Sequence, residues 1–132
     1  MKGFSENIEK LTLENDNFRQ VLYTAKYCQL VLMSLPVGGE IGSEIHEEND
    51  QFFRFESGEG KVLIDGNEYA VSDGSAIIVP AGAEHNVINI GEEPLKLYTI
   101  YSPAHHKDGI VRATREEAEA ANEEDFDGVT TE

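Results

Sequence analysis

The chain has 132 residues and a mass of 14.6 kDa, which is the size of one domain and leaves no room for a second core of ordinary size. It carries 26 acidic and 10 basic side chains, so its formal net charge is −16 and its pI is near 4.5. A surface this negative repels phosphate groups, which excludes nucleic acid and anionic membranes as expected partners.

Two strands are expected in the first third of the chain. The first 16 residues are polar apart from a few scattered apolar side chains, and we expect them to add an edge strand or to stay irregular. The runs Phe18–Tyr23 and Tyr27–Leu35 are rich in apolar side chains, and Pro36–Gly39 ends the second run. Within that run Cys28 alternates with leucines, which predicts a small buried side chain rather than a nucleophile.

Turn signals recur every eight to ten residues through the middle of the chain. Each contains glycine, and Asp65-Gly66 favours a type I′ hairpin, because such a turn needs positive φ at both central residues. The short runs between these turns, rich in β-branched and aromatic residues, are Gln51–Phe55, Lys61–Ile64, Glu68–Val71, Ala76–Val79, Asn86–Ile90 and Leu95–Tyr101. Many short strands without intervening helices indicate a β-sandwich or barrel.

The last part of the chain is acidic, and part of it is predicted to be helical. Residues 115–132 hold eight acidic side chains against Arg115 alone. Thr114 is an N-cap candidate for a helix over residues 114–127, with Glu117 at the capping-box position. Because few apolar side chains remain to dock this helix, we expect it to be peripheral or frayed, with a solvated acidic face.

No segment of the sequence predicts export or membrane insertion. The amino terminus lacks the apolar core of a signal peptide, and the longest apolar stretch, Leu30–Leu35, is too short to span a bilayer. Cys28, the one cysteine, cannot form an internal disulfide. We therefore expect a soluble, cytoplasmic protein.

A first spaced motif combines two glycines with three side chains that offer nitrogen or oxygen donors. It runs Gly38, five residues, Glu44, one residue, His46, four residues, Gln51, six residues, Gly58. Glu44 and His46 are two residues apart on an expected strand, so both side chains project from one face. A short loop follows, and Gln51 then opens the next strand with the same inward direction.

A second motif adds another histidine. It runs Gly74, five residues, Pro80, one residue, Gly82, two residues, His85, three residues, Asn89. Only a folded barrel brings His85, 39 residues after the histidine of the first motif, next to that motif. Together the motifs predict two imidazoles, one carboxylate and one amide oxygen facing a common point.

The two motifs resemble those of the cupin superfamily. The second matches the family pattern at its five fixed positions; the first matches in spacing, but has Glu44 where the family usually has histidine and Gln51 where it usually has glutamate. The resemblance implies an all-β, RmlC-like double-stranded β-helix, or jelly-roll barrel. We expect residues 1–28 to form an N-terminal segment with edge strands, 29–102 the cupin barrel, and 103–132 a short acidic C-terminal extension with helical character. Cupins include isomerases, dioxygenases, decarboxylases, lyases and plain binding proteins, so the resemblance leaves the reaction open.

The predicted ligands of a divalent metal are Glu44, His46, Gln51 and His85. Their donor set suits Mn, Fe, Ni or Zn, and without a thiolate it disfavours Cu(I). Without the amide, the other three side chains form a two-histidine, one-carboxylate face with open positions. The resemblance adds a parallel, since type I phosphomannose isomerases, also cupins, hold zinc with two histidines, a glutamate and a glutamine. A barrel that has lost its metal is the competing interpretation.

The segment around this site is strongly acidic. Within residues 40–59, Arg54 is the only basic side chain, which predicts high cation affinity and disfavours anionic substrates. Lys61 and Lys96 are further candidates for countering this charge. Strand parity turns Arg54 away from Gln51 and so outward.

Other side chains are candidates for the pocket lining. Phe53 and Phe55 lie on the inward face of their strand and are expected to be plain core. Which face of the last strand points inward is open, and for Tyr101 a hydroxyl in water is favoured over a proton-donating role. His105 and His106 follow the barrel; a solvated turn is favoured over a position at the pocket mouth.

The predicted function is that of a divalent-metal-binding cupin acting on a small molecule, as a sugar-isomerase-like or dioxygenase-type enzyme, with no catalytic residue assigned. A non-catalytic sensor or binding module for a small ligand is the alternative, and a metal-free barrel that serves oligomerisation is a third. The resemblance to small cupins also implies a homodimer, for which the apolar stretches Val21–Tyr27 and Leu30–Leu35 are the candidate surface.

Overall fold

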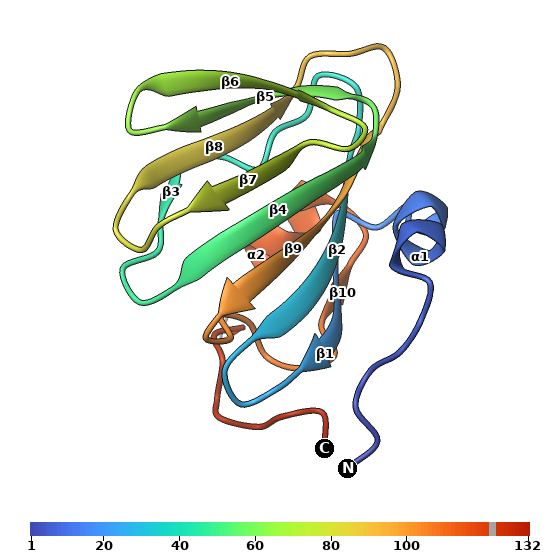
Figure 1. Ribbon diagram of the computed structural model, residues 1–132, viewed down its shortest axis with the longest axis vertical. Coiled ribbons are helices and arrows are strands. Elements are labelled where there is room, and N and C mark those ends of the chain that lie inside the picture. The colour runs from blue at the N-terminus through green and yellow to red at the C-terminus, as the bar shows by residue number, and fades with distance from the viewer. Residues whose placement is uncertain (122–123) are drawn as a thin grey trace.

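The computed structural model describes residues 1–121 and 124–132 (Figure 1). In chain order its elements are α1 (Ile8–Glu14), β1 (Arg19–Thr24), β2 (Gln29–Leu35), β3 (Glu44–Ile45), β4 (Asp50–Ser57), β5 (Glu59–Ile64), β6 (Asn67–Ser72), β7 (Ala76–Val79), β8 (Glu84–Asn89), β9 (Leu95–Ser102), β10 (Val111–Arg112) and α2 (Arg115–Ala120). Every strand that the turn spacing predicts is present, and β10 is a strand that it did not predict.

The strands form two antiparallel sheets that face each other. In the described residues, one sheet has the order β10-β1-β2-β9-β4-β7 and the other β3-β8-β5-β6. In Figure 1 the small sheet, with β5, β6 and β8, lies above the long strands β4, β9 and β2 of the large sheet. Inward side chains alternate along each strand, so Phe53 and Phe55 of β4 are fully buried, as is Val87 of β8. The predicted all-β jelly-roll fold is confirmed.

Alternation also settles the face of β9 that the sequence left open. Leu95, Leu97 and Thr99 are fully buried, and Tyr101 is 3% exposed. Their side chains therefore point into the barrel, between the two sheets.

The β5–β6 hairpin has the predicted turn. Asp65 and Gly66 both have positive φ, 46° and 83°, and the flanking residues Ile64 and Asn67 pair across the two strands. Glycine adopts such a φ at no steric cost, and aspartate tolerates it better than most residues.

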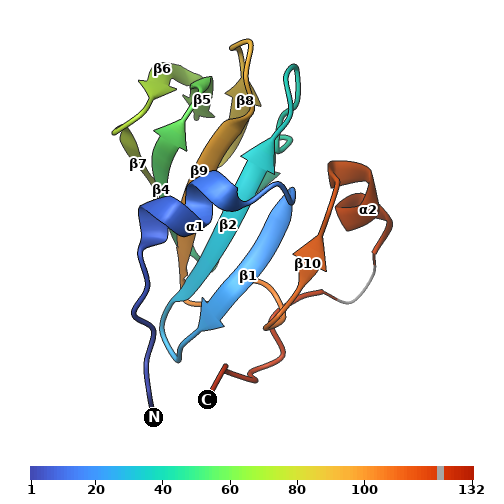
Figure 2. The ribbon, with the colours of Figure 1, turned by 90° about the vertical axis from the view of Figure 1, so that its right-hand side faces the viewer.

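Ile8–Glu14 form a helix, so the expectation that residues 1–16 add an edge strand or stay irregular is wrong for that stretch, while residues 1–7 are irregular. Asn7 caps α1, because its side-chain oxygen accepts a hydrogen bond from the Lys10 N–H. The spacing of Ile8, Leu11 and Thr12 is helical, and Thr12 is fully buried. The helix packs against β2, β4 and β9, where Figure 2 shows it crossing the outside of the large sheet.

The C-terminal helix begins as predicted and ends earlier. Thr114 caps α2 by accepting a hydrogen bond from the Glu117 N–H, while the Glu117 carboxylate reaches back to the Ala113 N–H. The helix ends at Ala120, and residues 122–123 of the predicted range 114–127 lie outside the described residues. No residue of α2 is buried, although Ala118 packs against the core.

The segment after α2 returns to the barrel. The Lys107 N–H donates to the Glu124 carbonyl at 2.7 Å, and the Phe126 N–H donates to the His105 carbonyl at 3.0 Å. These bonds fix the chain that follows β9. Among the described residues, no helix is long and apolar enough to cross a membrane.

Cys28 is exposed, so the expectation that it is buried is wrong. Strand β2 begins one residue later than Cys28, whose carbonyl accepts a hydrogen bond from the Ala25 N–H at 2.8 Å in the β1–β2 turn. A turn position has no inward face, so the alternation that holds along β2 does not extend to it.

Candidate metal centre

Strand pairing brings together the glutamate of the first motif and the histidine of the second. Glu44 of β3 is the direct partner of His85 of β8, so the two side chains lie on the same face of the small sheet. His46 follows two residues after Glu44. One donor atom each from Glu44, His46 and His85 lies within 4.8 Å of the other two. Three of the four predicted ligands therefore converge.

His46 presents a nitrogen without a hydrogen bond. Its Nε2 atom lies 2.9 Å from Glu44 Oε2, but the ring is not aligned for a hydrogen bond, and no other described residue supplies a partner. The His46 carbonyl accepts a hydrogen bond from the Gly82 N–H at 2.9 Å, which ties the two motifs together. Gly82 has a φ of 90°, a conformation that favours glycine at this point.

His85 is held in one tautomer. Its Nδ1 atom lies 3.1 Å from the carbonyl of Ala83, which can only accept, so Nδ1 carries the proton and Nε2 keeps its lone pair. Burial lowers the pKa of His85 below its ordinary value. The ring is therefore neutral at pH 7, the form that binds a metal.

Glu44 carries the negative charge of the site. Burial works to raise its pKa, but the contact with His46 and the positive charge of Arg19 outweigh burial, so the pKa lies below its ordinary value. At neutral pH the site thus holds one carboxylate beside the neutral ring of His85.

Gln51 comes from the opposite sheet. It is 3% exposed on β4, and its Nε2 donates a hydrogen bond to Thr99 Oγ1 at 3.0 Å. That bond fixes the amide and leaves Gln51 Oε1 buried without a partner among the described residues. A buried acceptor of this kind is uncommon in native proteins.

Three aromatic side chains at the end of the barrel form a second wall, which we call the histidine wall: Tyr101, His105 and His106. The His105 ring lies 4.2 Å from that of His46 between centroids and stacks on Tyr101 at 5.3 Å. His106 is 7% exposed, and its Nε2 lies 3.3 Å from the Tyr101 hydroxyl. The favoured expectations, a solvated turn at residues 105–106 and a tyrosine hydroxyl in water, are wrong.

The histidine wall is uncharged at neutral pH. Burial, with a smaller contribution from His46, lowers the pKa of His105 to about 4. Burial and the charge of Arg19 lower the pKa of His106 far below its ordinary value, and burial raises that of Tyr101.

A basic residue that the sequence analysis missed stands beside these groups. Arg19 is 8% exposed and shares the inward face of β1 with Val21. Strand parity could have predicted its position, because Arg19 lies two residues before the inward-facing Val21 on the predicted strand. The three basic residues named as candidates to counter the acidic charge form ion pairs at other places: Arg54 with Glu56, Lys61 with Glu68 and Lys96 with Asp16.

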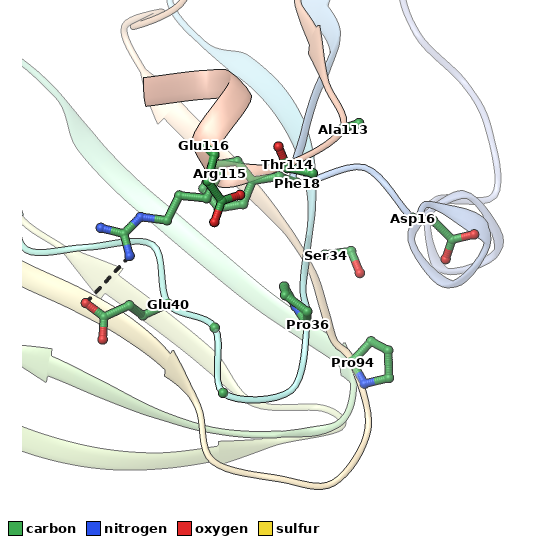
Figure 3. Close-up of a pocket in the computed structure, with 12 residues that line it drawn as sticks. Asp16, Phe18, Ser34, Pro36, Glu40, Pro94, Ala113, Thr114, Arg115 and Glu116 are labelled. Carbon is green, nitrogen blue, oxygen red and sulfur yellow. Dashed lines mark ion pairs between the residues drawn. The ribbon is translucent and has the colours of Figure 1, made fainter. Parts of the chain in front are cut away.

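A hollow of about 380 Å³ opens beside the centre, lined by Glu44, Arg19, His105 and His106 together with residues of the C-terminal extension. A separate pocket of about 580 Å³ lies between the 36–40 loop and the start of α2, where Arg115 reaches toward Glu40 (Figure 3). Of the convergent ligands, Glu44 lines the first hollow, and none lines this second pocket.

Asn89, the last position of the second motif, serves the fold. Its amide nitrogen donates to the carbonyls of Leu35, Pro36 and Glu93 at 2.9–3.1 Å, and its oxygen accepts from the Gly91 N–H. The motif therefore mixes a candidate ligand, His85, with a structural clamp on the same strand.

The family model of the cupin domain matches residues 31–101. The chain belongs to the cupin family. Its sequence is 47% identical to the uncharacterized protein YrkC of Bacillus subtilis over 128 residues, which cover 92% of this chain and 69% of YrkC. It is 42% identical to the uncharacterized protein L612 of Acanthamoeba polyphaga mimivirus over 113 residues, which cover 83% of this chain and 71% of L612.

This cupin also matches a solved structure closely. The crystal structure of BH2720 from Bacillus halodurans superposes with a TM-score of 0.89 at 44% identity, covering 91% of this chain and 96% of that one. The likeness extends beyond residues 31–101 and therefore includes more than the barrel matched by the family model.

Proposed function

We propose that this cupin binds a divalent metal through Glu44, His46, Gln51 and His85 and acts on a small molecule in the adjoining hollow. The convergence of donor atoms from Glu44, His46 and His85 within 4.8 Å carries the proposal. Two imidazoles and one carboxylate form a set that leaves coordination positions open for a substrate.

Two buried atoms without partners support the fit of a metal. Gln51 Oε1 and His46 Nε2 lack hydrogen bonds within the described part of the chain. Leaving a buried acceptor unsatisfied costs about 1–3 kcal/mol, and a cation offsets that cost where a hydrogen-bond donor is missing. Nitrogen and oxygen donors without thiolate favour Mn, Fe, Ni or Zn.

The chain's own residues would shape the reaction space. When bound, such a metal polarises a substrate oxygen or supplies redox chemistry. Tyr101 and His105 present neutral faces to the site, and the His106–Tyr101 contact at 3.3 Å orients the phenol. The C-terminal extension, held at residues 105–107, covers one side and limits the entry of water.

The proposal is of an enzyme, either sugar-isomerase-like or dioxygenase-type. Two histidines with one carboxylate and open positions suit both classes. A binding module would use the same pocket without turnover. A panel of sugars, keto acids and catechols, tested with each of the four metals, separates the two: consumption of a substrate supports the enzyme, and thermal stabilisation without turnover supports the module.

A matched pair of variants tests the metal site. Glu44→Gln removes the carboxylate of the centre, and Glu84→Gln makes the same change one residue from His85, at an exposed side chain. We expect wild type and Glu84→Gln, purified without chelator, to hold about one divalent ion per chain by elemental mass spectrometry. We expect Glu44→Gln to hold less than about a tenth of the wild-type metal content, because one of the proposed ligands is lost. Equal metal content in both variants would contradict the assignment.

A further inference from the structure

Arg19 is a buried cation next to the candidate metal centre. It points inward from β1, is 8% exposed, and lines the hollow that Glu44, His105 and His106 also line. Its Nε atom is buried without a hydrogen-bond partner in residues 1–121 and 124–132, and the nearest aromatic contact is with the Phe18 ring at 5.3 Å. An ionised group in this position calls for an anion, because removal from water is costly unless the charge is paired.

Four carboxylates line this hollow; three have other partners, and the fourth, Asp125, makes no ion pair with Arg19 over the described residues. Glu124 forms an ion pair with Arg112, the cross-strand neighbour of Arg19. Glu119 forms an ion pair with Arg115 at 2.8 Å. Glu44 lies against His46 and, over the described residues, makes no ion pair with Arg19. Within the described residues, no carboxylate forms an ion pair with the Arg19 guanidinium, which lines the hollow.

Arg19 and a bound metal would supply the positive charge that an anionic ligand needs in this hollow. A divalent ion with one carboxylate and otherwise neutral ligands would leave a net charge of +1 at the centre, and Arg19 adds a positive charge where it lines the hollow. The acidic segment around residues 40–59 lies mainly in exposed or partly exposed positions, where water screens its charge. Glu119, Glu124 and Asp125 also line the hollow, so its rim is acidic, and an anionic ligand would depend on Arg19 and the metal for its charge pairing.

We propose that Arg19 binds the carboxylate of a small organic acid, a 2-oxo or 2-hydroxy acid, whose neighbouring oxygen faces Glu44, His46 and His85. The inference rests on the proposed function and narrows its substrate class from small molecules to small carboxylic acids. A guanidinium matches a carboxylate with two parallel N–H donors, and a hollow of about 380 Å³ suits a molecule of this size.

Calorimetric titration of the Mn²⁺-loaded protein with pyruvate and with its uncharged analogue pyruvamide tests the assignment. We expect wild type to bind pyruvate more tightly than pyruvamide. Arg19→Gln should weaken pyruvate binding at least tenfold with little effect on pyruvamide, and Arg19→Lys should restore part of the loss. The matched control is Arg54→Gln, which removes a partly exposed arginine that pairs with Glu56 and should bind pyruvate as wild type does.

Metal content, measured on the same samples, separates this inference from the proposed function. If wild type holds Mn²⁺ and Arg19→Gln binds pyruvate as tightly as wild type, or if wild type binds no pyruvate, the role of Arg19 is wrong and the metal site stands. If wild type holds no Mn²⁺, the metal proposal is wrong. The titration of the metal-free protein then decides Arg19 alone: a loss of pyruvate affinity in Arg19→Gln supports the assignment, and equal affinity overturns it.

Thermal melting of Arg19→Met distinguishes a ligand-binding arginine from a structural one. Replacing an unpaired buried charge by an apolar side chain of similar length should leave the melting temperature of the ligand-free protein unchanged or raise it by a few degrees. A fall of several degrees would show that Arg19 stabilises the fold and would overturn the assignment.

Discussion

The two walls of the candidate metal centre are built from different kinds of chain. The motif wall, formed by Glu44, His46 and His85, lies on and beside paired strands of the small sheet. The histidine wall combines Tyr101, near the end of β9, with two histidines from the segment that follows β9, and hydrogen bonds hold that segment to one that follows α2. Motif spacing therefore identifies the residues of the first wall, whereas the second wall depends on how the C-terminal extension folds back.

The largest expected effect concerns the motif wall. His85→Ala removes a proposed ligand whose tautomer is fixed by Ala83, so we expect metal affinity to fall at least a thousandfold, which is about 4 kcal/mol. Competition with a fluorescent chelator measures the affinity, and circular dichroism checks that the barrel stays folded. A folded variant with wild-type affinity would remove His85 from the ligand set.

On the same strand, Asn89→Ala should affect the fold and leave the metal site intact. The amide of Asn89 donates to three carbonyls that would be left without it, so we expect the free energy of unfolding to fall by about 3 kcal/mol. Urea unfolding gives the stability, and metal content should stay near wild type. If Asn89→Ala lost its metal but kept its stability, Asn89 would belong to the metal site and would not be the structural clamp described here.

The histidine wall should make stability dependent on pH. The folded protein holds His106 neutral, with its pKa far below 6.5, whereas the unfolded chain takes up a proton near 6.5. The unfolded state therefore binds more protons in acid, and stability falls as the pH drops below 6.5. Between pH 7 and pH 5 this contributes about 2 kcal/mol, which His106→Gln should abolish. Urea unfolding of wild type and His106→Gln at the two pH values measures this contribution. If the stability of both proteins falls equally between pH 7 and pH 5, His106 is accessible to protons in the folded state.

The smallest effect is expected from His105→Ala. The ring covers His46 at 4.2 Å between centroids but belongs to no predicted ligand set, so the metal should remain bound. Its removal opens the centre, and we expect EDTA to strip the metal about tenfold faster, a difference of about 1.4 kcal/mol in the barrier. Lys107→Ala is the control. Loss of metal in His105→Ala would show that His105 is itself a ligand and would contradict its assignment to the non-ligating histidine wall.

Most of the fold could be predicted from the sequence, because its strands and turns are specified by short stretches of neighbouring residues. Alternating β-branched and aromatic residues between glycine-containing turns placed the central strands, and Asp65-Gly66 specified a hairpin that the structure contains. Helix α1 was missed because its sequence is polar and its apolar residues are few, so that Ile8, Leu11 and Thr12 did not stand out as a helical face. Cys28 was misplaced by extending strand periodicity into a turn.

The candidate site divides in the same way. The side chains of Glu44, His46 and His85 could be assigned to one site from motif spacing, strand parity and the resemblance to the cupin barrel, which supplies the contact between segments 39 residues apart. The positions of Tyr101 and His105 depend on contacts between residues 105–107 and 124–126, which no short-range pattern encodes. Arg19 lies between these cases, because its inward direction follows from strand parity but its position beside the centre requires the closed barrel.

The most direct test of the central claim is an anomalous-difference map from crystals grown with Zn²⁺. We predict one strong peak per chain inside the barrel, about 2.1 Å from one nitrogen of His46, one nitrogen of His85 and one oxygen of Glu44, with Gln51 Oε1 facing it. A fully occupied peak elsewhere, or a barrel interior without a peak at saturating Zn²⁺, would contradict the account.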